Sequence, residues 1–328
     1  MDTSVQANKT ACKICQNDAM NTIYYAREMM FDLRETFTYL ECSQCHCLQL
    51  LDPPADMRKY YPPEYYSTFE SPEERFRNPI EIRMRALRAD YAATGKGLMG
   101  RIISTRKPDV RAHGLLRLGV TKDSRIMDVG CGSGHFLYVL RSAGFSHVMG
   151  VDPFIDATIS YKNGLTIHKQ FVHTVGGTWD IIMFHHSFEH IPNPMETLRF
   201  VMQLLAPGGA CLIRIPTSSS YAWEHYRTNW VQLDAPRHYF LHSMESMSLL
   251  AAQAGLAVDE VVYDSAALQF WGSEQYLRDI PLDAPQSYKR DPEHSLFTSE
   301  QIVDFQRRAE ALNQQRRGDQ AAFYLKKP

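Results

Sequence analysis

From about residue 121 onward, short apolar runs alternate with longer amphipathic segments. The apolar runs have the length of buried strands, whereas the segments between them repeat apolar residues at helical spacing. The strand-like runs are RIMDVG, HVMGVD, LTIHKQ, DIIMFHH, ACLIRIP and LAVDEVVYDS, and the helix-like segments are HFLYVLRSAG, PMETLRFVMQLLAPGG and SMESMSLLAAQAG. Strands that alternate with helices are typical of a parallel sheet with helices on both faces. The pattern therefore predicts an α/β domain over residues 121–328.

Local signals mark one helix and one insertion in this domain. The segment NPME, from Asn193 to Glu196, offers a capping side chain, a proline at the first helical position and a glutamate three residues after the cap. The sequence PGG at 207–209 predicts the end of that helix. A polar stretch over about 272–320 contains FTSEQIVDFQRRAEALNQQRR, which reads as a helix, and AAFYLKK then reads as a last strand. We expect 272–320 to be a helical insertion over the sheet.

Five of the seven cysteines lie before residue 50, and four of them form two C-x-x-C pairs. The pairs are Cys12 with Cys15 and Cys42 with Cys45. This spacing suits four thiolates around one zinc ion, and four protein ligands make a closed, structural site. His46 and Cys47 are alternative ligands, although the paired spacing favours Cys45. We predict a small zinc ribbon and its Tyr- and Pro-rich exit within residues 1–70.

Composition places the chain among globular proteins and supplies little electrostatic attraction for nucleic acid. Of its 328 residues 44% are hydrophobic, and 35 Lys and Arg against 37 Asp and Glu give a net charge of −2. The start MDTSVQANKT lacks a basic segment followed by an apolar core, and no run of about 18 apolar residues occurs. We therefore expect a cytoplasmic protein without a membrane span, and nucleic acid is a disfavoured partner.

One segment departs from the acidic balance. Between Arg75 and Arg111, eight Arg and two Lys face three acidic residues, a local charge of +7. The apolar spacing there is helical, so we expect a basic helical linker over 71–120. A solvated helix face is the default interpretation, and a grip on a diphosphate or another anion is the functional one.

The sequence DVGCGSG forms the first strand-to-helix turn, where open parallel sheets bind their ligands. Neither a G-x-G-x-x-G dinucleotide motif nor a P-loop is present. Instead Asp128 stands just before the glycines and Asp152 ends the next strand. Two carboxylates favour a cationic ligand with hydroxyl groups, and S-adenosylmethionine fits, since Asp152 can accept from its ribose and Asp128 can attract its amino group.

Four motifs then occur in order over roughly residues 121–265: DVGCGSG, the acid in VDPF, WDIIMFHHSFEHIPNP and LLAPGGACLIRIP. Together they resemble the class I S-adenosylmethionine-dependent methyltransferases. The resemblance implies a Rossmann-like seven-stranded sheet whose last strand, AAFYLKK here, is antiparallel. It also implies that His185 lies against the cofactor. The predicted cofactor-binding residues are Asp128, Gly130, Cys131, Gly132, Gly134, Asp152, Pro153, Phe154 and His185. The family's usual acidic residue near adenine is absent, so Phe154 and Gln170 are the candidates there.

A zinc ribbon, YYPPEYY, this domain and NWVQLDAPRHYFLHS together resemble bacterial methyltransferases of sugar and cell-surface polysaccharide biosynthesis. The implied acceptor is a small polar molecule, a sugar nucleotide or glycan precursor. The enzyme alternative is a ribosomal RNA methyltransferase with a cysteine module. The alternative from another class is a scaffold protein that keeps the cofactor fold without catalysis.

Methyl transfer from a sulfonium needs an aligned acceptor and a group that removes its proton. Histidine suits this role near neutral pH, so His190, His238 and His186 are the candidate bases, the first two preferred. For each, a structural hydrogen bond is an equally good interpretation. Glu189 is a candidate partner for them. Four tyrosines can line the acceptor or form an aromatic seam between domains: Tyr60, Tyr61, Tyr65 and Tyr66.

Overall fold

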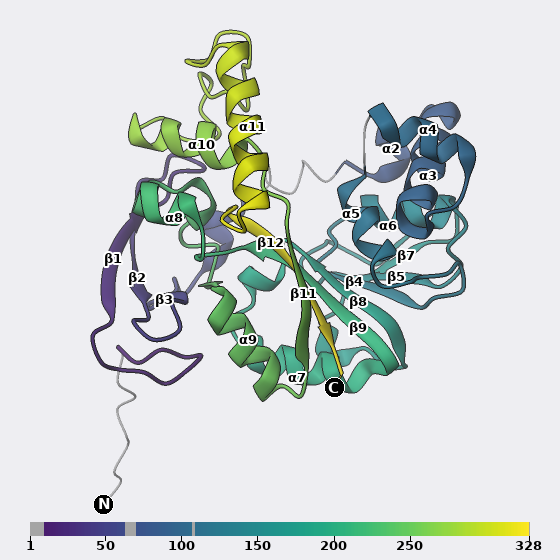
Figure 1. Ribbon diagram of the computed structural model, residues 1–328, viewed down its shortest axis with the longest axis horizontal. Coiled ribbons are helices and arrows are strands. Elements are labelled where there is room, and N and C mark those ends of the chain that lie inside the picture. The colour runs from purple at the N-terminus through teal and green to yellow at the C-terminus, as the bar shows by residue number, and fades with distance from the viewer. Residues whose placement is uncertain (1–9, 63–69, 107–108, 328) are drawn as a thin grey trace, which may run out of the picture.

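The computed structural model describes residues 10–62, 70–106 and 109–327. Its central layer is one mixed sheet (Figure 1). The strands of this sheet are β4 (Ile126–Val129), β5 (Val148–Val151), β6 (Ile159–Ser160), β7 (Thr166–His168), β8 (Trp179–His185), β9 (Leu205–Pro216), β11 (Ala257–Tyr263) and β12 (Gln320–Lys326). They lie in the order β11-β12-β9-β8-β4-β5-β7-β6.

The middle of the sheet is parallel and its two sides are not. Strands β9, β8, β4, β5 and β7 pair in parallel, whereas β12 runs antiparallel between β9 and β11. The antiparallel final strand over AAFYLKK is therefore confirmed. The predicted count of seven strands is wrong for the described residues, because the two-residue β6 adds an eighth antiparallel to β7. So short a strand carries no hydrophobic periodicity from which to predict it.

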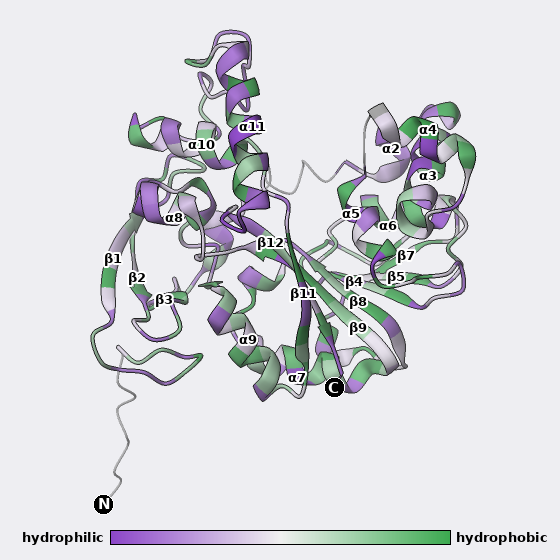
Figure 2. Cartoon of the chain, in the orientation of Figure 1, coloured by the Kyte–Doolittle hydropathy of each residue, from purple (hydrophilic) through white to green (hydrophobic). Residues whose placement is uncertain are grey.

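Helices cover both faces of the sheet (Figure 1). On one face lie α5 (Val110–Leu116) and α6 (His135–Ser142), and on the other lie α7 (Pro194–Leu204) and α9 (Met244–Gln253). Buried strand side chains alternate between two apolar clusters, so that Met127 faces the α7 side and Ile126 faces the α6 side. Figure 2 shows the hydrophobic colouring concentrated on these central strands.

The ends of α7 differ from the prediction in two details. Asn193 is its N-cap and Pro194 its first residue, yet no side chain caps the helix by a hydrogen bond. The helix ends at Leu204, before the PGG sequence, because Leu205 is already extended and pairs with Trp179 of β8. Tertiary strand pairing therefore ended this helix earlier than the local turn signal.

The N-terminal residues form a second, smaller sheet. Its strands are β1 (Thr22–Arg27), β2 (Thr36–Glu41), β3 (Leu48–Leu50) and β10 (Phe240–Leu241), in that order. Strand β10 comes from the chain 190 residues after β3 and pairs with it through Phe240 and Leu241. We call residues 10–62 the N-terminal module. The pairing ties this module to the loop that precedes β10.

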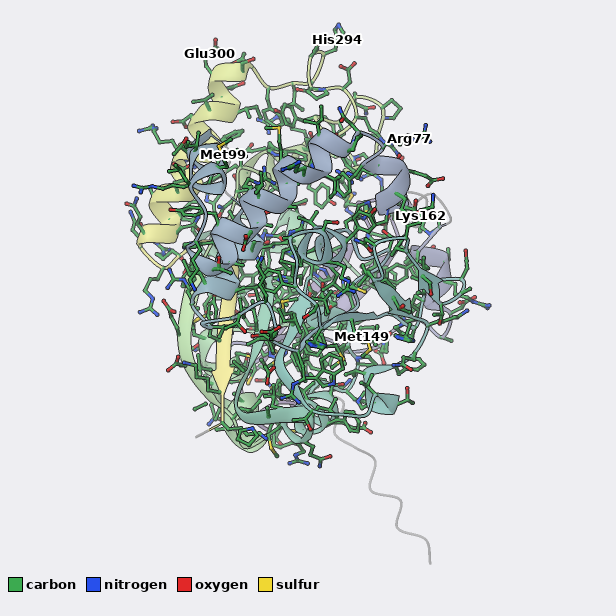
Figure 3. The ribbon with its side chains drawn as sticks, turned by 90° about the vertical axis from the view of Figure 1, so that its right-hand side faces the viewer. Arg77, Met99, Met149, Lys162, His294 and Glu300 are labelled. Atoms are coloured by element: carbon green, nitrogen blue, oxygen red, sulfur yellow. The ribbon has the colours of Figure 1, made fainter. Side chains whose placement is uncertain are left out.

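The insertion lies above the sheet, next to the N-terminal module (Figure 1). It contains α10 (Leu268–Leu277) and α11 (Ser299–Gln314), and α8 (Tyr221–Tyr226) packs below it. The helix expected in FTSEQIVDFQRRAEALNQQRR is thus confirmed. Figure 3 places His294 and Glu300 at the far end of this insertion. Short 3-10 turns are η1 (Met57–Tyr60), η2 (Val172–Thr174), η3 (Phe188–His190), η4 (Arg227–Asn229) and η5 (Val231–Leu233).

The basic segment is helical, as expected. It forms α2 (Pro72–Arg75), α3 (Pro79–Thr94), α4 (Leu98–Arg106) and α5, with Arg77 and Met99 at its outer surface in Figure 3. Several of its arginines have acidic partners, such as Arg85 with Glu81. The guanidinium of Arg111 lies over the Phe136 ring, where Asp109 and Asp128 act on its charge. Within the described residues no helix is both long and apolar enough to cross a membrane.

Candidate active site

The turn between β4 and α6 has the backbone geometry of a ligand cradle. Gly130, Gly132 and Gly134 all have positive φ, at 72°, 56° and 75°. A side chain at Gly130 would place its Cβ 2.5 Å from the Cβ of Ser187, and one at Gly134 would collide with Ile167. Glycine is therefore required both for the backbone conformation and for space. The backbone of the turn is left open to a ligand at the carboxyl end of the sheet.

Asp128, at the end of β4, is 4% exposed. Among the described residues its Oδ1 atom has no hydrogen-bond partner. Burial raises its pKa to about 7, with Asp152 adding to this rise and Arg111 opposing it. An unpaired carboxylate oxygen in a buried site is costly unless a ligand completes it. The ammonium group of S-adenosylmethionine is a ligand of that kind.

Asp152, at the end of β5, lies opposite the glycine turn. Its Oδ2 accepts from the Gly132 N–H at 2.9 Å and its Oδ1 accepts from the Phe154 N–H at 2.8 Å. Two backbone donors fix the carboxylate and leave each oxygen a further lone pair for a ribose hydroxyl. Pro153 is half-buried, and the Phe154 ring is 68% exposed beside this carboxylate.

Cys131 and His185 are the remaining predicted cofactor residues, and Gln170 is a candidate beside adenine. The Cys131 thiol packs under the turn, and burial raises its pKa well above the usual range, so it is no nucleophile. His185 ends β8, and its ring stands edge-on to Phe136 at 5.5 Å between centroids. In the described part of the chain neither ring nitrogen of His185 has a hydrogen-bond partner. Burial lowers the pKa of this histidine well below its ordinary value, so the ring is neutral. Gln170 is half-buried on the loop after β7.

The candidate bases gather around one carboxylate on the loop after β8. Glu189 is fully buried, and neither of its oxygens has a hydrogen-bond partner among the residues described. His186 Nδ1 lies 3.5 Å and His238 Nε2 lies 4.0 Å from its Oε1. Burial opposes ionisation of Glu189, but His186, His190 and His238 outweigh it and lower the pKa to about 2. The cluster therefore holds a buried negative charge among imidazoles.

His190 and His238 pack edge to face, with 4.7 Å between ring centroids. His238 Nδ1 lies 2.8 Å from the Gln232 carbonyl oxygen, and His190 Nδ1 lies 3.0 Å from the Arg237 carbonyl oxygen. Because a carbonyl only accepts, each Nδ1 donates to its carbonyl oxygen, and the neutral His238 ring keeps a lone pair on Nε2. Burial, with His190 beside it, lowers the pKa of His238 to about 4, against the attraction of Asp234 and Glu189. At neutral pH the His238 ring is therefore uncharged, and its Nε2 can accept a proton.

His186 has a different environment. It has a positive φ of 54°, and its side chain is 39% exposed. Its Nε2 lies 2.8 Å from Arg214 Nη1, and Arg214 Nε donates to Asp264 Oδ2 at 2.6 Å. An arginine only donates hydrogen bonds, so His186 Nε2 already accepts a hydrogen bond from Arg214. The arrangement leaves His186 less available as a base than His190 and His238.

The tyrosines divide between the two interpretations. Tyr61 reaches the cluster, with its hydroxyl 3.1 Å from His190 Nδ1. Tyr60 is buried and donates to Glu35 at 2.6 Å, so it belongs to the aromatic packing of the N-terminal module. Tyr65 and Tyr66 lie outside the described residues.

The four predicted cysteine ligands come together. Cys12 Sγ lies 3.5 Å from Cys45 Sγ, and Cys15 Sγ lies 3.4 Å from Cys42 Sγ. All four sulfur atoms are within 4.8 Å of one another. Zinc–sulfur bonds of about 2.3 Å in a tetrahedron place the sulfurs about 3.8 Å apart, close to this arrangement. Cys47 instead points to His242 Nδ1 at 3.9 Å, and the His46 side chain is exposed.

Sequence reasoning missed the charged residues that support the cluster. Arg237, which stands directly before His238 in the chain, is fully buried and pairs with Asp234 and Glu28. Arg214 of β9 contacts His186 at 2.8 Å. A charge at an ordinary position in a loop carries no sequence signal of its burial, so only the tertiary structure reveals these partners.

Comparison with known proteins agrees with this geometry. Residues 102–261 match the family described as "Methyltransferase domain". Over 154 residues the chain is 30% identical to the C-methyltransferase NovU of Streptomyces niveus. This alignment covers 44% of this chain and 36% of the relative. It is 29% identical over 96 residues to a ubiquinone biosynthesis O-methyltransferase of Aromatoleum aromaticum, covering 26% and 41%. It is 25% identical over 115 residues to a tRNA U34 carboxymethyltransferase of Desulfotalea psychrophila, covering 31% and 36%.

These alignments span well under two thirds of each curated relative. What the chain shares with them is therefore a domain rather than a whole protein. The parallel strands, the glycine turn with its two carboxylates and the family match agree with one another. Residues 102–261 accordingly form a class I S-adenosylmethionine-dependent methyltransferase domain, with S-adenosylmethionine as its cofactor.

Proposed function

We propose that the chain transfers the methyl group of S-adenosylmethionine directly to a small polar acceptor, a sugar nucleotide or related glycan precursor. The observation that carries the proposal is a juxtaposition at the carboxyl end of the sheet. The glycine turn with Asp128 and Asp152 lies beside the loop after β8, which supplies Glu189 and His190. A cofactor cradle next to a set of proton acceptors is the minimum that direct methyl transfer needs.

On the cofactor side, the chain supplies shape and charge. Asp152 would accept hydrogen bonds from the ribose, Asp128 would hold the amino group, and the glycine turn would let the backbone approach closely. Cys131, Pro153, Phe154 and His185 would complete the walls. When bound, S-adenosylmethionine supplies a methyl group on a positively charged sulfur, which is already a good leaving group.

On the acceptor side, His190 or His238 would take the proton of the attacking group at Nε2. The resulting imidazolium would lie beside the buried Glu189 carboxylate, which stabilises the positive charge. A positioned base of this kind contributes roughly 10²- to 10⁴-fold to a rate. His186 is the third candidate, weakened by its contact with Arg214.

We further propose that Cys12, Cys15, Cys42 and Cys45 hold a structural zinc ion. Their four sulfur atoms and the N–H groups near them support this. The backbone N–H of Ile14 and that of Cys45 lie 3.4 Å from Cys12 Sγ and 3.5 Å from Cys42 Sγ. Such donors stabilise thiolates.

A screen of acceptors tests the function. Purified chain is incubated with methyl-labelled S-adenosylmethionine and a panel of nucleotide sugars, and products are identified by mass spectrometry. We expect a mass gain of one methyl group on a nucleotide sugar, with S-adenosylhomocysteine formed in equal amount. A variant with both His190→Ala and His238→Ala should lose at least about a hundredfold in turnover, as loss of a base does. The exposed His147→Ala is the matched control.

Three results would contradict the proposal. Methyl incorporation into RNA with a steep salt dependence would assign an RNA acceptor. No S-adenosylhomocysteine with any acceptor would favour a scaffold. Turnover that required added Mn²⁺ would reassign the two histidines from base to metal ligand, because Glu189, His190 and His238 also offer ligand atoms within 4.8 Å of one another.

A further inference from the structure

The loop that carries His238 is held from the N-terminal module. Tyr39 of β2 donates to the His238 carbonyl oxygen at 2.8 Å, and β10 pairs with β3 directly after it. Ser243 Oγ, just beyond β10, donates to the Cys45 carbonyl oxygen at 2.5 Å. The N-terminal module therefore contacts this loop at three successive places: His238, β10 and Ser243.

A fourth link is a buried chain of charges. Arg237 is fully buried, as is Glu28 of the N-terminal module, and Arg237 Nη2 donates to Glu28 Oε1 at 2.7 Å. Glu28 in turn accepts the backbone N–H groups of Met30, Phe31 and Leu33 at 3.0–3.2 Å. Arg237 Nη1 also donates to the Tyr60 carbonyl oxygen at 3.1 Å. One end of the guanidinium is thus fixed by the module.

The other end of the guanidinium binds Asp234. Arg237 Nε lies 3.0 Å from both carboxylate oxygens, and Nη2 lies 2.7 Å from Oδ1. By contrast His238 Nε2 lies 3.8 Å from Asp234 Oδ2, beyond hydrogen-bond distance. Asp234 therefore lies near both a guanidinium and an imidazole, and in this structure it is bound to the guanidinium of Arg237. If the arginine were absent, the carboxylate would have the imidazole as its nearest partner.

We propose that Arg237 is a positioning residue for His238. Anchored on Glu28 of the N-terminal module, its guanidinium holds the Asp234 carboxylate away from the imidazole and so keeps the Nε2 lone pair free. The module thereby acts on the acceptor side of the site without contacting the acceptor. The inference rests on the proposed role of His238 as a base only for its consequence in catalysis, not for its geometry.

The charged and titratable groups that face His238 come from two elements. Glu189 and His190 lie on η3, and Asp234 lies on the loop of His238 itself. Tyr61 of the N-terminal module contacts His190, which in turn packs against the His238 ring. Of these groups Asp234 is the one whose partner is Arg237, so removing Arg237 changes mainly the carboxylate that would pair with the imidazole.

The test is the titration of His238 in the zinc-loaded full chain, followed by NMR with ring-labelled histidine and assigned through His238→Gln. In the wild-type protein we expect a neutral ring with Nδ1 protonated and a pKa of about 4. In Arg237→Gln the pKa of His238 should rise by about one unit or more, because the freed Asp234 carboxylate favours the imidazolium. Arg34→Gln, which breaks an exposed ion pair of the same module with Asp279, should leave the titration unchanged.

The double variant Glu28→Gln with Arg237→Gln guards against loss of folding. It removes Arg237 together with its Glu28 partner, so that Asp234 is the one carboxylate left without the arginine. Proteins tolerate this better than the loss of Arg237 alone, which leaves both carboxylates unpaired. The pKa of His238 should rise in this variant too. An unchanged titration of His238 in a folded Arg237→Gln or double variant would overturn the proposal.

The same variants separate this inference from the proposed function. If His238 is the base, the ascending limb of the pH–rate profile for methyl transfer should move to higher pH in Arg237→Gln. A raised pKa of His238 with an unmoved pH–rate profile would uphold the positioning role and reject His238 as the base.

Discussion

Single side chains at the end of the parallel strands differ mainly in how their carboxylates are satisfied. Asp152 is held by two backbone N–H groups, whereas Asp128 has an oxygen without a partner and a raised pKa. The two donors fix the orientation of the Asp152 carboxylate, whereas burial raises the pKa of Asp128 until a cation reaches it. The two acids of the turn thus suit two different ends of one ligand.

The first prediction concerns Asp152. Asp152→Ala removes the ribose acceptor and should weaken S-adenosylmethionine binding by roughly one to two orders of magnitude, since hydrogen bonds to a charged group contribute about 1.5–3 kcal/mol. Isothermal titration calorimetry measures it. Asp156→Ala, an exposed acid four residues later, is the control and should bind normally. Equal affinities for both variants would refute the assignment of Asp152.

The second prediction is a pH dependence set by Asp128. Its pKa is about 7 in the folded chain against an ordinary value of 3.8, so the folded state binds a proton that the unfolded state has lost. The cofactor-free protein should therefore lose stability as the pH rises from about 4 through 7. Cofactor affinity should change in the opposite sense, rising up to about tenfold between pH 6 and pH 8 as the carboxylate ionises.

Asp128→Asn is the matched variant for this prediction, because an amide has the same shape and does not titrate. Thermal unfolding and calorimetry across pH 5 to pH 8 should show a flat profile for both quantities. A wild-type profile as flat as that of the variant would show that Asp128 does not titrate in this range.

At the level of elements, the glycine turn depends on both backbone conformation and space. Gly134 begins α6 with a φ of 75°, and a Cβ there would collide with Ile167 of β7. Gly144 follows the same helix with a φ of 94° and nothing within 4 Å of such a Cβ. The two glycines share the left-handed backbone conformation but differ in the free space around a Cβ atom. Substitutions at the two positions are therefore a matched pair.

The third prediction follows from this pair. Gly144→Ala should cost roughly 1–2 kcal/mol of stability from backbone strain alone. Gly134→Ala should cost roughly 1–3 kcal/mol more, because the collision with Ile167 is added, and should abolish cofactor binding. Urea unfolding and calorimetry measure these effects. Similar losses of stability in the two variants would show that the turn can shift to make room.

Across the whole molecule, the acceptor side of the site is assembled from distant parts of the chain. His190 follows β8, His238 precedes β10, and both are supported by the N-terminal module through Tyr61 and Glu28. The cofactor side lies on β4 and β5, and in the part of the chain that the structure describes the side-chain hydrogen bonds of Asp152 go to Gly132 and Phe154 rather than to the module. Unfolding of the N-terminal module should therefore disrupt the acceptor side of the site and leave the cofactor side intact.

The fourth prediction uses this separation. Removing the metal with a chelator, or substituting Cys12→Ser with Cys45→Ser, should unfold the module, because metal binding supplies about 10–16 kcal/mol in small zinc domains. Turnover should fall by at least about a hundredfold, while S-adenosylmethionine still binds. Metal analysis, calorimetry and a coupled turnover assay measure the three quantities. Cys211→Ala, buried in β9, should retain its zinc. Full turnover in the metal-free chain would contradict the dependence.

Much of this architecture follows from local patterns. The alternation of apolar runs and amphipathic segments specifies the strands and helices, since residues with strand and helix periodicity must bury one face each. Local rules also specify the glycine turn with its neighbouring acid and the C-x-x-C pairs, because each needs particular residue types at short spacing. The cofactor and metal residues named from these patterns remain predictions, although they lie together as such sites require.

Tertiary structure alone decided the features that depend on distant contacts. The early end of α7 and the pairing of β10 with β3 arise from partners far along the chain. The same is true of Arg237 between Glu28 and Asp234, where a guanidinium is stable only because folding buries two carboxylates beside it. Short-range sequence patterns predict helices, strands and turns, whereas the burial of a residue and the pairing of charges depend on the assembled fold.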